Sequence, residues 1–208
     1  MPKDTDLQLV FFRSGPTDWD EAERLQGRSD LPLSASGQAS LADLVETTLG
    51  GLPSVPKLVL AGPDEASARV AEIVAEQSGA KKRGMDALAA LHCGLWEGRL
   101  ESEIAERSPK AFRPWKQDPT SASPPEGESI LDAQSRVLDA LARGIEKVSS
   151  GPVVVALRPI PLALARLAVE GRPLSDMWDA ISETPRVWTV TAPRSVFRNH
   201  TRPLDASA

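Results

Sequence analysis

Short runs of apolar residues alternate along the chain with longer stretches of helical periodicity. Uniformly apolar or β-branched runs of three to six residues are typical of strands buried on both faces of a sheet. We therefore predict strands at residues 7–12 (LQLVFF), 58–60, 153–155 and 187–191.

The stretches between these runs carry apolar residues at helical spacing. Ser34 can cap a helix in which Leu41, Leu44, Val45 and Leu49 share a face, and Gly50–Gly51 would end it. Three more helices are expected, over residues 64–79, 131–145 and 161–169.

Strands that alternate with helices indicate a three-layer α/β/α fold with a mostly parallel central sheet. We expect one domain over residues 1–191 and a tail over residues 192–208. Residues 99–128 interrupt the pattern and hold five of the 18 prolines. We interpret this segment as an insertion that covers the mouth of a pocket.

Composition narrows the function. The chain has 208 residues and a net charge of −5 without a basic block, which argues against a nucleic-acid partner. Cys93 is the single cysteine, so no internal disulfide forms, and no cluster of metal ligands stands out. The chain has no run of about 18 apolar residues and no signal-peptide pattern at its start. We expect a cytoplasmic protein that does not enter a membrane.

In parallel sheets the ligand site lies beyond the carboxyl ends of the strands, and the residues there carry recognisable motifs. Residues 13–19 read RSGPTDW and residues 25–33 read LQGRSDLPL. Further motifs are WEG at 96–98, PEGES at 125–129 with Asp132 and Arg136, and GRPL at 171–174 with Trp178. In order and spacing these resemble the histidine phosphatase, or phosphoglycerate mutase-like, family from about residue 7 to residue 190.

The resemblance implies a phosphoryl-transfer site, but most of its residues differ here. The family's nucleophilic histidine falls on Ser14, and the arginine before it is present as Arg13. Its second arginine falls on Ala66, its acid on Ala90 and its second histidine on Arg158. A chain without the nucleophile, the acid and a cation is expected to lack phosphatase and mutase activity.

The remaining polar residues favour an anion-binding cleft. We expect Arg13, Ser14, Thr17 and Arg158 to line it and to hold a phosphate or a phosphorylated small molecule. Alternatively, each arginine pairs with a nearby carboxylate, of Asp18, Asp20 or Asp64. Asp20 falls where the family's sugar-phosphate mutases carry Asn, and a carboxylate there would repel phosphate.

Other residues near the motifs have ordinary interpretations. Arg69 could reach back to replace the arginine lost at position 66, although a surface position is expected. His92 is expected to be a solvated or packed histidine, Cys93 a small core residue, and His200 lies in the tail.

Three functions stay open. The first is a catalytically inactive family member that binds a phosphorylated ligand or a protein partner in its cleft, without a cofactor or metal. The second is a phosphomonoesterase with rewired chemistry that uses Ser14 or His92 with Arg13 and Arg158. The third is a structural or oligomerisation module whose pocket is filled.

Overall fold

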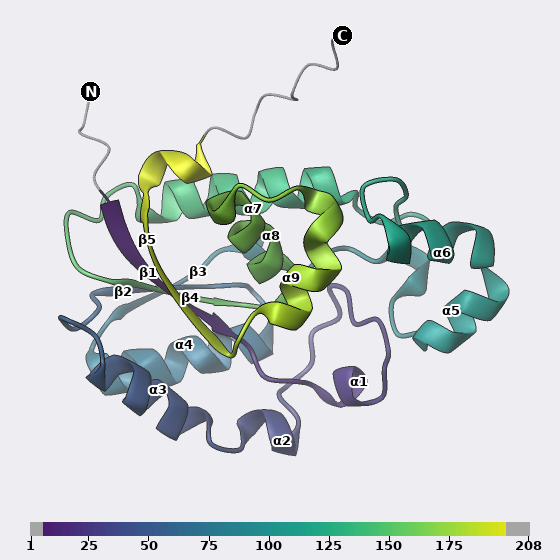
Figure 1. Cartoon of the computed structure of the whole chain (residues 1–208). Helices are drawn as coiled ribbons and strands as arrows, with labels where there is room; N and C mark the ends of the chain where they lie inside the picture. The colour runs from purple at the N-terminus through teal and green to yellow at the C-terminus, as the bar shows by residue number, and fades with distance from the viewer. Residues whose placement is uncertain (1–5, 199–208) are drawn as a thin grey trace, which may run out of the picture.

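The predicted apolar runs lie side by side in a five-stranded sheet between two layers of helices (Figure 1). This computed structural model describes residues 6–198. The sheet order is β3-β2-β4-β1-β5, and only β5 runs antiparallel to its neighbour. The strands are β1 (Asp6–Arg13), β2 (Leu58–Ala61), β3 (Lys81–Gly84), β4 (Val153–Leu157) and β5 (Val187–Pro193). The three-layer, mostly parallel fold predicted from the sequence is confirmed.

Successive residues of the central strands face opposite helical layers, so each layer encloses its own apolar core. On one face Leu9, Phe11 and Val155 pack with α7 and α8. On the other face Val10, Phe12 and Val154 pack with α3 and α4. The helices are α1 (Asp18–Glu21), α2 (Ala35–Gln38), α3 (Leu41–Gly50), α4 (Glu65–Ser78), α5 (Glu101–Arg107), α6 (Pro109–Gln117), α7 (Ile130–Ile145), α8 (Pro159–Glu170) and α9 (Met177–Glu183). Four short 3₁₀ helices cover Asp86–Leu88, Gly94–Trp96, Leu174–Asp176 and Arg194–Phe197.

Several elements differ from the prediction. The helix expected after Ser34 is two helices, because Ser40 adopts a left-handed backbone conformation with φ of 57° between them. The strand β3 was not predicted, since Lys81, Lys82 and Arg83 are exposed and give no apolar run. Lysines on a sheet edge discourage pairing with other chains, which suits its outer position. Helices α1 and α9 were not predicted either.

The tail begins later than the predicted boundary at residue 192. Ala192 and Pro193 belong to β5 and pair with Leu7 and Asp6 of β1. The following 3₁₀ turn buries Phe197, which is 1% exposed, against the core beneath α7 and α8. The expectation for His200 lies outside the described residues.

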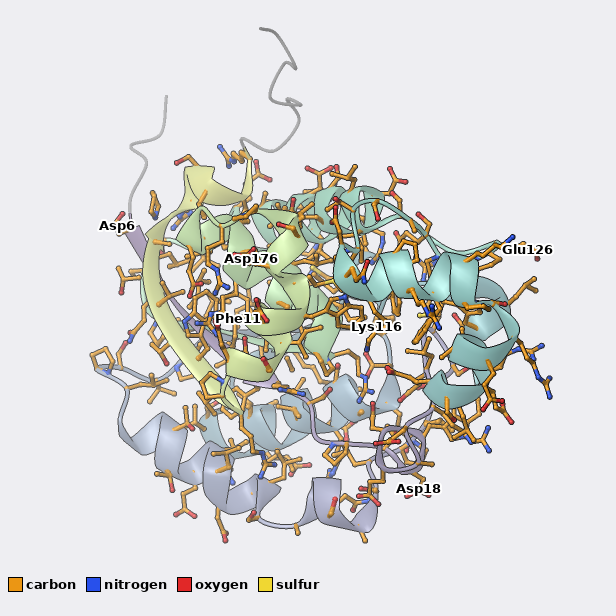
Figure 2. The ribbon with its side chains drawn as sticks, turned by 45° about the vertical axis from the view of Figure 1, so that its right-hand side comes forward. Asp6, Phe11, Asp18, Lys116, Glu126 and Asp176 are labelled. Atoms are coloured by element: carbon orange, nitrogen blue, oxygen red, sulfur yellow. The ribbon has the colours of Figure 1, made fainter. Side chains whose placement is uncertain are left out.

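An aromatic cluster joins the predicted insertion to the rest of the domain. Trp115 of α6 lies 5.4 Å from Trp96 and 4.7 Å from Trp178 of α9, measured between ring centroids. The Trp178 indole N–H also donates to the Trp115 carbonyl at 3.1 Å. Figure 2 shows Lys116 between α6 and α9, and its ammonium lies 4.3 Å from the Trp178 ring centroid. The insertion is therefore fixed in place by packing.

Trp115→Ala should lower the free energy of unfolding by about 3–5 kcal/mol, because it opens a cavity at the centre of this cluster. Urea unfolding followed by circular dichroism measures the change. Leu131→Ala is the control, since Leu131 is 60% exposed and its truncation should change stability little. Equal effects of the two substitutions would contradict the role given to Trp115.

Candidate functional site

Arg13 and Arg158 reach the same edge of the sheet because their strands are neighbours. Arg13 is the last residue of β1, Arg158 follows the last residue of β4, and Arg13 is in register with Leu157. Arg158 then caps the start of α8, where Pro159 fixes the first turn. The parallel pairing thus places two cations where the sequence predicted a cleft.

Arg158 is buried and forms an ion pair with Asp20. Its side chain is 5% exposed, and its Nη2 lies 2.8 and 2.7 Å from the two carboxylate oxygens of Asp20. Nη2 also donates to Gln26 Oε1 at 2.9 Å, and Nη1 donates to the Gly15 carbonyl at 3.2 Å. Of the two arrangements considered from the sequence, pairing with a nearby carboxylate is the one that Arg158 adopts.

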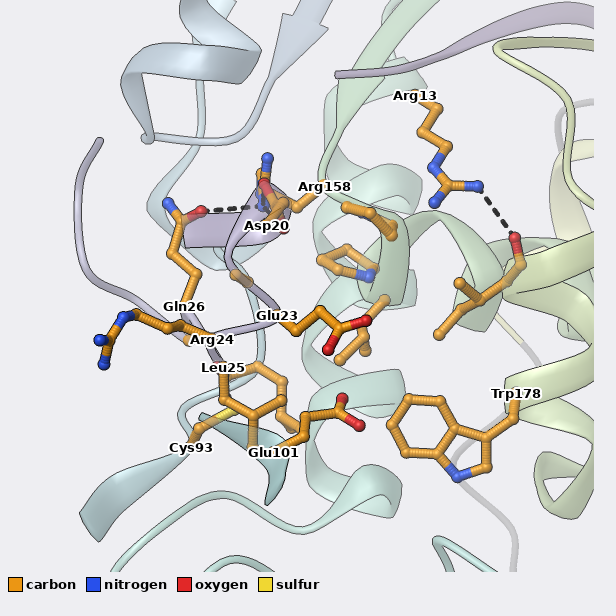
Figure 3. Close-up of a pocket in the computed structure, with 17 residues that line it drawn as sticks. Arg13, Asp20, Glu23, Arg24, Leu25, Gln26, Cys93, Glu101, Arg158 and Trp178 are labelled. Carbon is orange, nitrogen blue, oxygen red and sulfur yellow. Dashed lines mark hydrogen bonds and ion pairs between the residues drawn. The ribbon is translucent and has the colours of Figure 1, made fainter. Parts of the chain in front are cut away.

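Arg13 has no carboxylate within ion-pair distance among residues 6–198 and points instead toward α9 (Figure 3). Its Nη1 donates to the carbonyls of Ile181, at 3.0 Å, and Thr184, at 3.4 Å. Burial lowers the pKa of the Arg13 guanidinium from its ordinary value; nearby Asp20 opposes this shift and Arg158 adds to it. Arg13 therefore remains available to a negatively charged group in the cleft.

Ser14 and Thr17 lie at the same edge of the sheet as the two arginines, and their hydroxyl groups differ in hydrogen bonding. Ser14 is 4% exposed, and its Oγ has no hydrogen-bond partner, so no base activates it. Thr17 caps α1, and its backbone N–H donates to Asp20 at 2.7 Å. The Thr17 hydroxyl lies 2.9 Å from Asp20 Oδ2 and 2.7 Å from Gln26 Oε1, and its one proton can serve only one of them at a time.

The other predicted positions divide between core, cleft and surface. Ala66 is fully buried in the core beneath α3 and α4, whereas Ala90 lines the cleft. Arg69 lies on the surface, 3.4 Å from Glu72, as expected. The His92 side chain is 43% exposed and is not among the residues that line the cleft. Cys93 is buried beside Glu97 and Glu128, and burial first and then these carboxylates raise the pKa of its thiol to about 12.

The cleft is open and has both charged and apolar walls. Its volume is about 410 Å³, and Leu25, Ile160, Trp178 and Ile181 supply apolar surface. Figure 3 shows the carboxylates of Glu23 and Glu101 directed into the cavity on the side opposite Trp178. A smaller cavity of about 320 Å³ lies beside it, and Arg13, Asp20, Arg158 and Pro159 line both.

The sequence alone did not identify Gln26, Glu23 or Glu101 as residues of the cleft. Gln26 belongs to the LQGR motif, so its position in the site was open to prediction from the resemblance. Glu23 enters the cleft because its backbone adopts φ of 55°, and Glu101 enters from the start of α5 in the insertion. Neither position follows from spacing along the chain.

The model of the histidine phosphatase superfamily (branch 1) matches residues 9–197, which begins within β1 and includes every later strand and helix described above. The chain belongs to the histidine phosphatase superfamily.

Several curated relatives carry the names of enzymes. Glucosyl-3-phosphoglycerate phosphatase of Mycobacterium tuberculosis is 31% identical over 129 residues, which cover 62% of this chain and 56% of the relative. Phosphoserine phosphatase 1 of Hydrogenobacter thermophilus is 28% identical over 178 residues, which cover 83% and 80% of the two chains. The match to the mycobacterial phosphatase thus spans little more than half the length of that relative.

Solved structures of the superfamily share the fold. The Bacillus stearothermophilus protein YhfR superposes with a TM-score of 0.76 at 26% identity, over 86% of this chain and 85% of that one. The mycobacterial glucosyl-3-phosphoglycerate phosphatase in complex with VO3 has a TM-score of 0.73 at 26% identity, with coverage of 82% and 85%. None of the described helices of this chain has the length and apolar character needed to span a membrane.

A second ion pair, between Arg136 and Glu128, holds the loop that carries Ala90. Arg136 of α7 donates to Glu128 at 2.8 and 2.7 Å and to the carbonyls of Ala87, Ala89 and Ala90. Burial is the largest single effect on the Glu128 carboxyl and would raise its pKa, but the hydrogen bonds and charge of Arg136, the His92 N–H and the charge of Arg28 together outweigh it. The net pKa of Glu128 lies below its ordinary value.

Glu128→Gln should reduce the free energy of unfolding by about 2 kcal/mol at neutral pH, because it removes the charge that Arg136 binds. A carboxyl whose pKa is lowered by folding stabilises the fold above its ordinary pKa of 4.5 and loses this contribution as the pH falls below it. The gap between wild type and variant should therefore narrow in acid, which urea unfolding at neutral and acid pH measures. The exposed neighbour Glu126, changed to Gln, is the control and should follow the wild type at both pH values.

Proposed function

We propose that this chain is a catalytically inactive member of the histidine phosphatase superfamily that binds a small organic ligand in its cleft. The observation that carries the proposal is an open cavity of about 410 Å³ in which no nucleophile is paired with a base within the described residues. Ser14 stands where the superfamily's resemblance places a histidine, and its Oγ has no partner. The proposed ligand contacts are Arg13 and the walls of the cleft; Ser14 lines the smaller cavity instead, with its Oγ buried.

Losses at several positions act together on the chemistry. Removal of a single donor that stabilises a transition state typically lowers the rate by about 10²–10³. Here Ala66 and Ala90 carry no functional group, Arg158 is bound by Asp20, and Ser14 has no base. The alternative of a rewired phosphomonoesterase is less well supported, since His92 does not line the cleft. The alternative of a filled pocket is less well supported because the cavity is open.

The first test is hydrolysis of an aryl phosphate from acid to mildly alkaline pH, with Arg13→Ala beside the wild type. We expect no turnover above the uncatalysed rate in either protein, because no imidazole or activated hydroxyl is available to attack phosphorus. Turnover that disappears in Arg13→Ala would show a working site and would contradict the inactive assignment.

The second test is thermal stabilisation by a panel of small carboxylates, amines and aromatic compounds. A bound ligand raises the unfolding temperature of the wild type by mass action. The matched variant Ala90→Phe places a ring in the cavity and should lose the compounds that stabilise the wild type. The ligand-binding part of the proposal would be contradicted if no compound stabilised the wild type. It would also be contradicted if the same compounds stabilised the wild type and Ala90→Phe equally.

A further inference from the structure

The Asp20 carboxylate is held as a bound oxyanion would be held. It accepts hydrogen bonds from Arg158 Nη2 at 2.8 and 2.7 Å and from the Thr17 backbone N–H at 2.7 Å. The Thr17 hydroxyl lies 2.9 Å from the same carboxylate. Charge-assisted contacts of this kind are the ones by which proteins hold phosphate and carboxylate ligands. Here the anion is a side chain of the protein itself.

The Asp20 carboxylate belongs to the walls of two neighbouring cavities at the carboxyl ends of β1 and β4. Asp20 lines both cavities, together with Arg13, Arg158 and Pro159. Because Asp20 and Arg158 line both of these cavities, an external anion in either one faces the Asp20 carboxylate as well as the Arg158 guanidinium. Both protons of Arg158 Nη2 are already directed to Asp20 and Gln26, so this nitrogen has no donor left for another anion.

Charges elsewhere in the larger cavity also disfavour a doubly charged anion. Arg13, Arg24 and Arg158 line it together with Asp20, Glu23 and Glu101, so the formal charges of these six side chains sum to zero. Arg24 donates to the Gly98 carbonyl at 2.7 Å, and Figure 3 shows it directed away from the cavity. Arg13 lines the cavity on the side of α9 and has no carboxylate partner among the described residues.

We propose that Asp20 is the specificity-determining residue of the cleft: its carboxylate occupies the anion position at Arg158 and excludes phosphate groups from it. This inference rests on the proposed ligand-binding role and narrows the ligand to an uncharged or zwitterionic organic molecule with apolar surface. Arg13 then meets a single negative charge or a polar oxygen. The apolar part of the ligand lies against Leu25, Ile160, Ile181 and Trp178.

The decisive variants remove the charge of Asp20. Asp20→Asn keeps the size of the side chain and an oxygen that can cap α1, and Asp20→Ala also vacates the space. Asp18→Asn is the matched control, because Asp18 is an exposed residue of the same helix and its loss changes the net charge equally. Inorganic phosphate and phenyl phosphate are the probes, and isothermal titration calorimetry measures their affinity.

We expect Asp20→Asn and Asp20→Ala to bind both probes at least about tenfold more tightly than the wild type, because a buried guanidinium is left without its counter-charge. Asp18→Asn should match the wild type. Phosphate should also raise the unfolding temperature of the Asp20 variants and leave those of the wild type and Asp18→Asn unchanged. The double variant Asp20→Asn/Arg158→Gln should lose the gain, which locates the bound anion at Arg158.

Two results would overturn the inference. One is that neither Asp20 variant binds the probes more tightly than Asp18→Asn, although circular dichroism shows both to be folded. The other is that the wild type binds phosphate as tightly as the Asp20 variants. If the Asp20 variants do not gain phosphate affinity, the assignment of an inactive protein still holds. If no compound of the panel stabilises the wild type, ligand binding is contradicted, but the effect of Asp20 on phosphate affinity is not.

Discussion

The ion pair between Asp20 and Arg158 sets the arrangement of the whole cleft. The start of α8 fixes Arg158 at the end of β4 and buries its guanidinium, and a buried charge without a partner is strongly destabilising. Asp20 of α1 satisfies this requirement, and the ion pair joins the segment after β1 to the segment after β4. Arg13, which lies close to a second guanidinium, extends instead to carbonyls at the C-terminal end of α9. Partial negative charge at a helix C-terminus favours a cation there.

The fold tolerates substitutions in this site because most of its stability comes from the two apolar cores rather than from the cleft. The two apolar cores on the faces of the sheet consist of residues from β1, β2, β4 and the helices above and below them. Ala66, where the resemblance places an arginine, is a fully buried member of one core, so its methyl group packs where a charged side chain would require a partner. A chain of this superfamily can therefore keep its architecture while its chemistry changes, since a fold does not determine a function.

How far the sequence predicts the structure depends on where an apolar pattern exists. The pattern identifies β1, β2, β4, α4 and α7, whose buried positions recur at strand or helix spacing. It misses β3, because an edge strand of Lys81, Lys82 and Arg83 needs no apolar face, and it misses the break at Ser40, which depends on one backbone angle.

Within the site, the strand ends predict that Arg13 and Arg158 lie at the same edge of the sheet. The sequence does not distinguish Asp18, Asp20 and Asp64 as ion-pair partners of these arginines. Only the turn of α1, with Thr17 as its cap, directs Asp20 rather than Asp18 toward Arg158.

The backbone at Glu23 shapes one wall of the cleft. A residue other than glycine with φ of 55° is strained by about 1–2 kcal/mol. The conformation directs the Glu23 carboxylate into the cavity, and the Glu23 carbonyl accepts the Glu101 N–H at 3.1 Å, which brings the second carboxylate alongside (Figure 3). A pocket without a ligand would be more stable if apolar side chains filled it, because empty volume forfeits packing contacts. The open cavity and its charged walls thus support the proposed ligand-binding role, and under the proposal for Asp20 the ligand carries no phosphate group at Arg158.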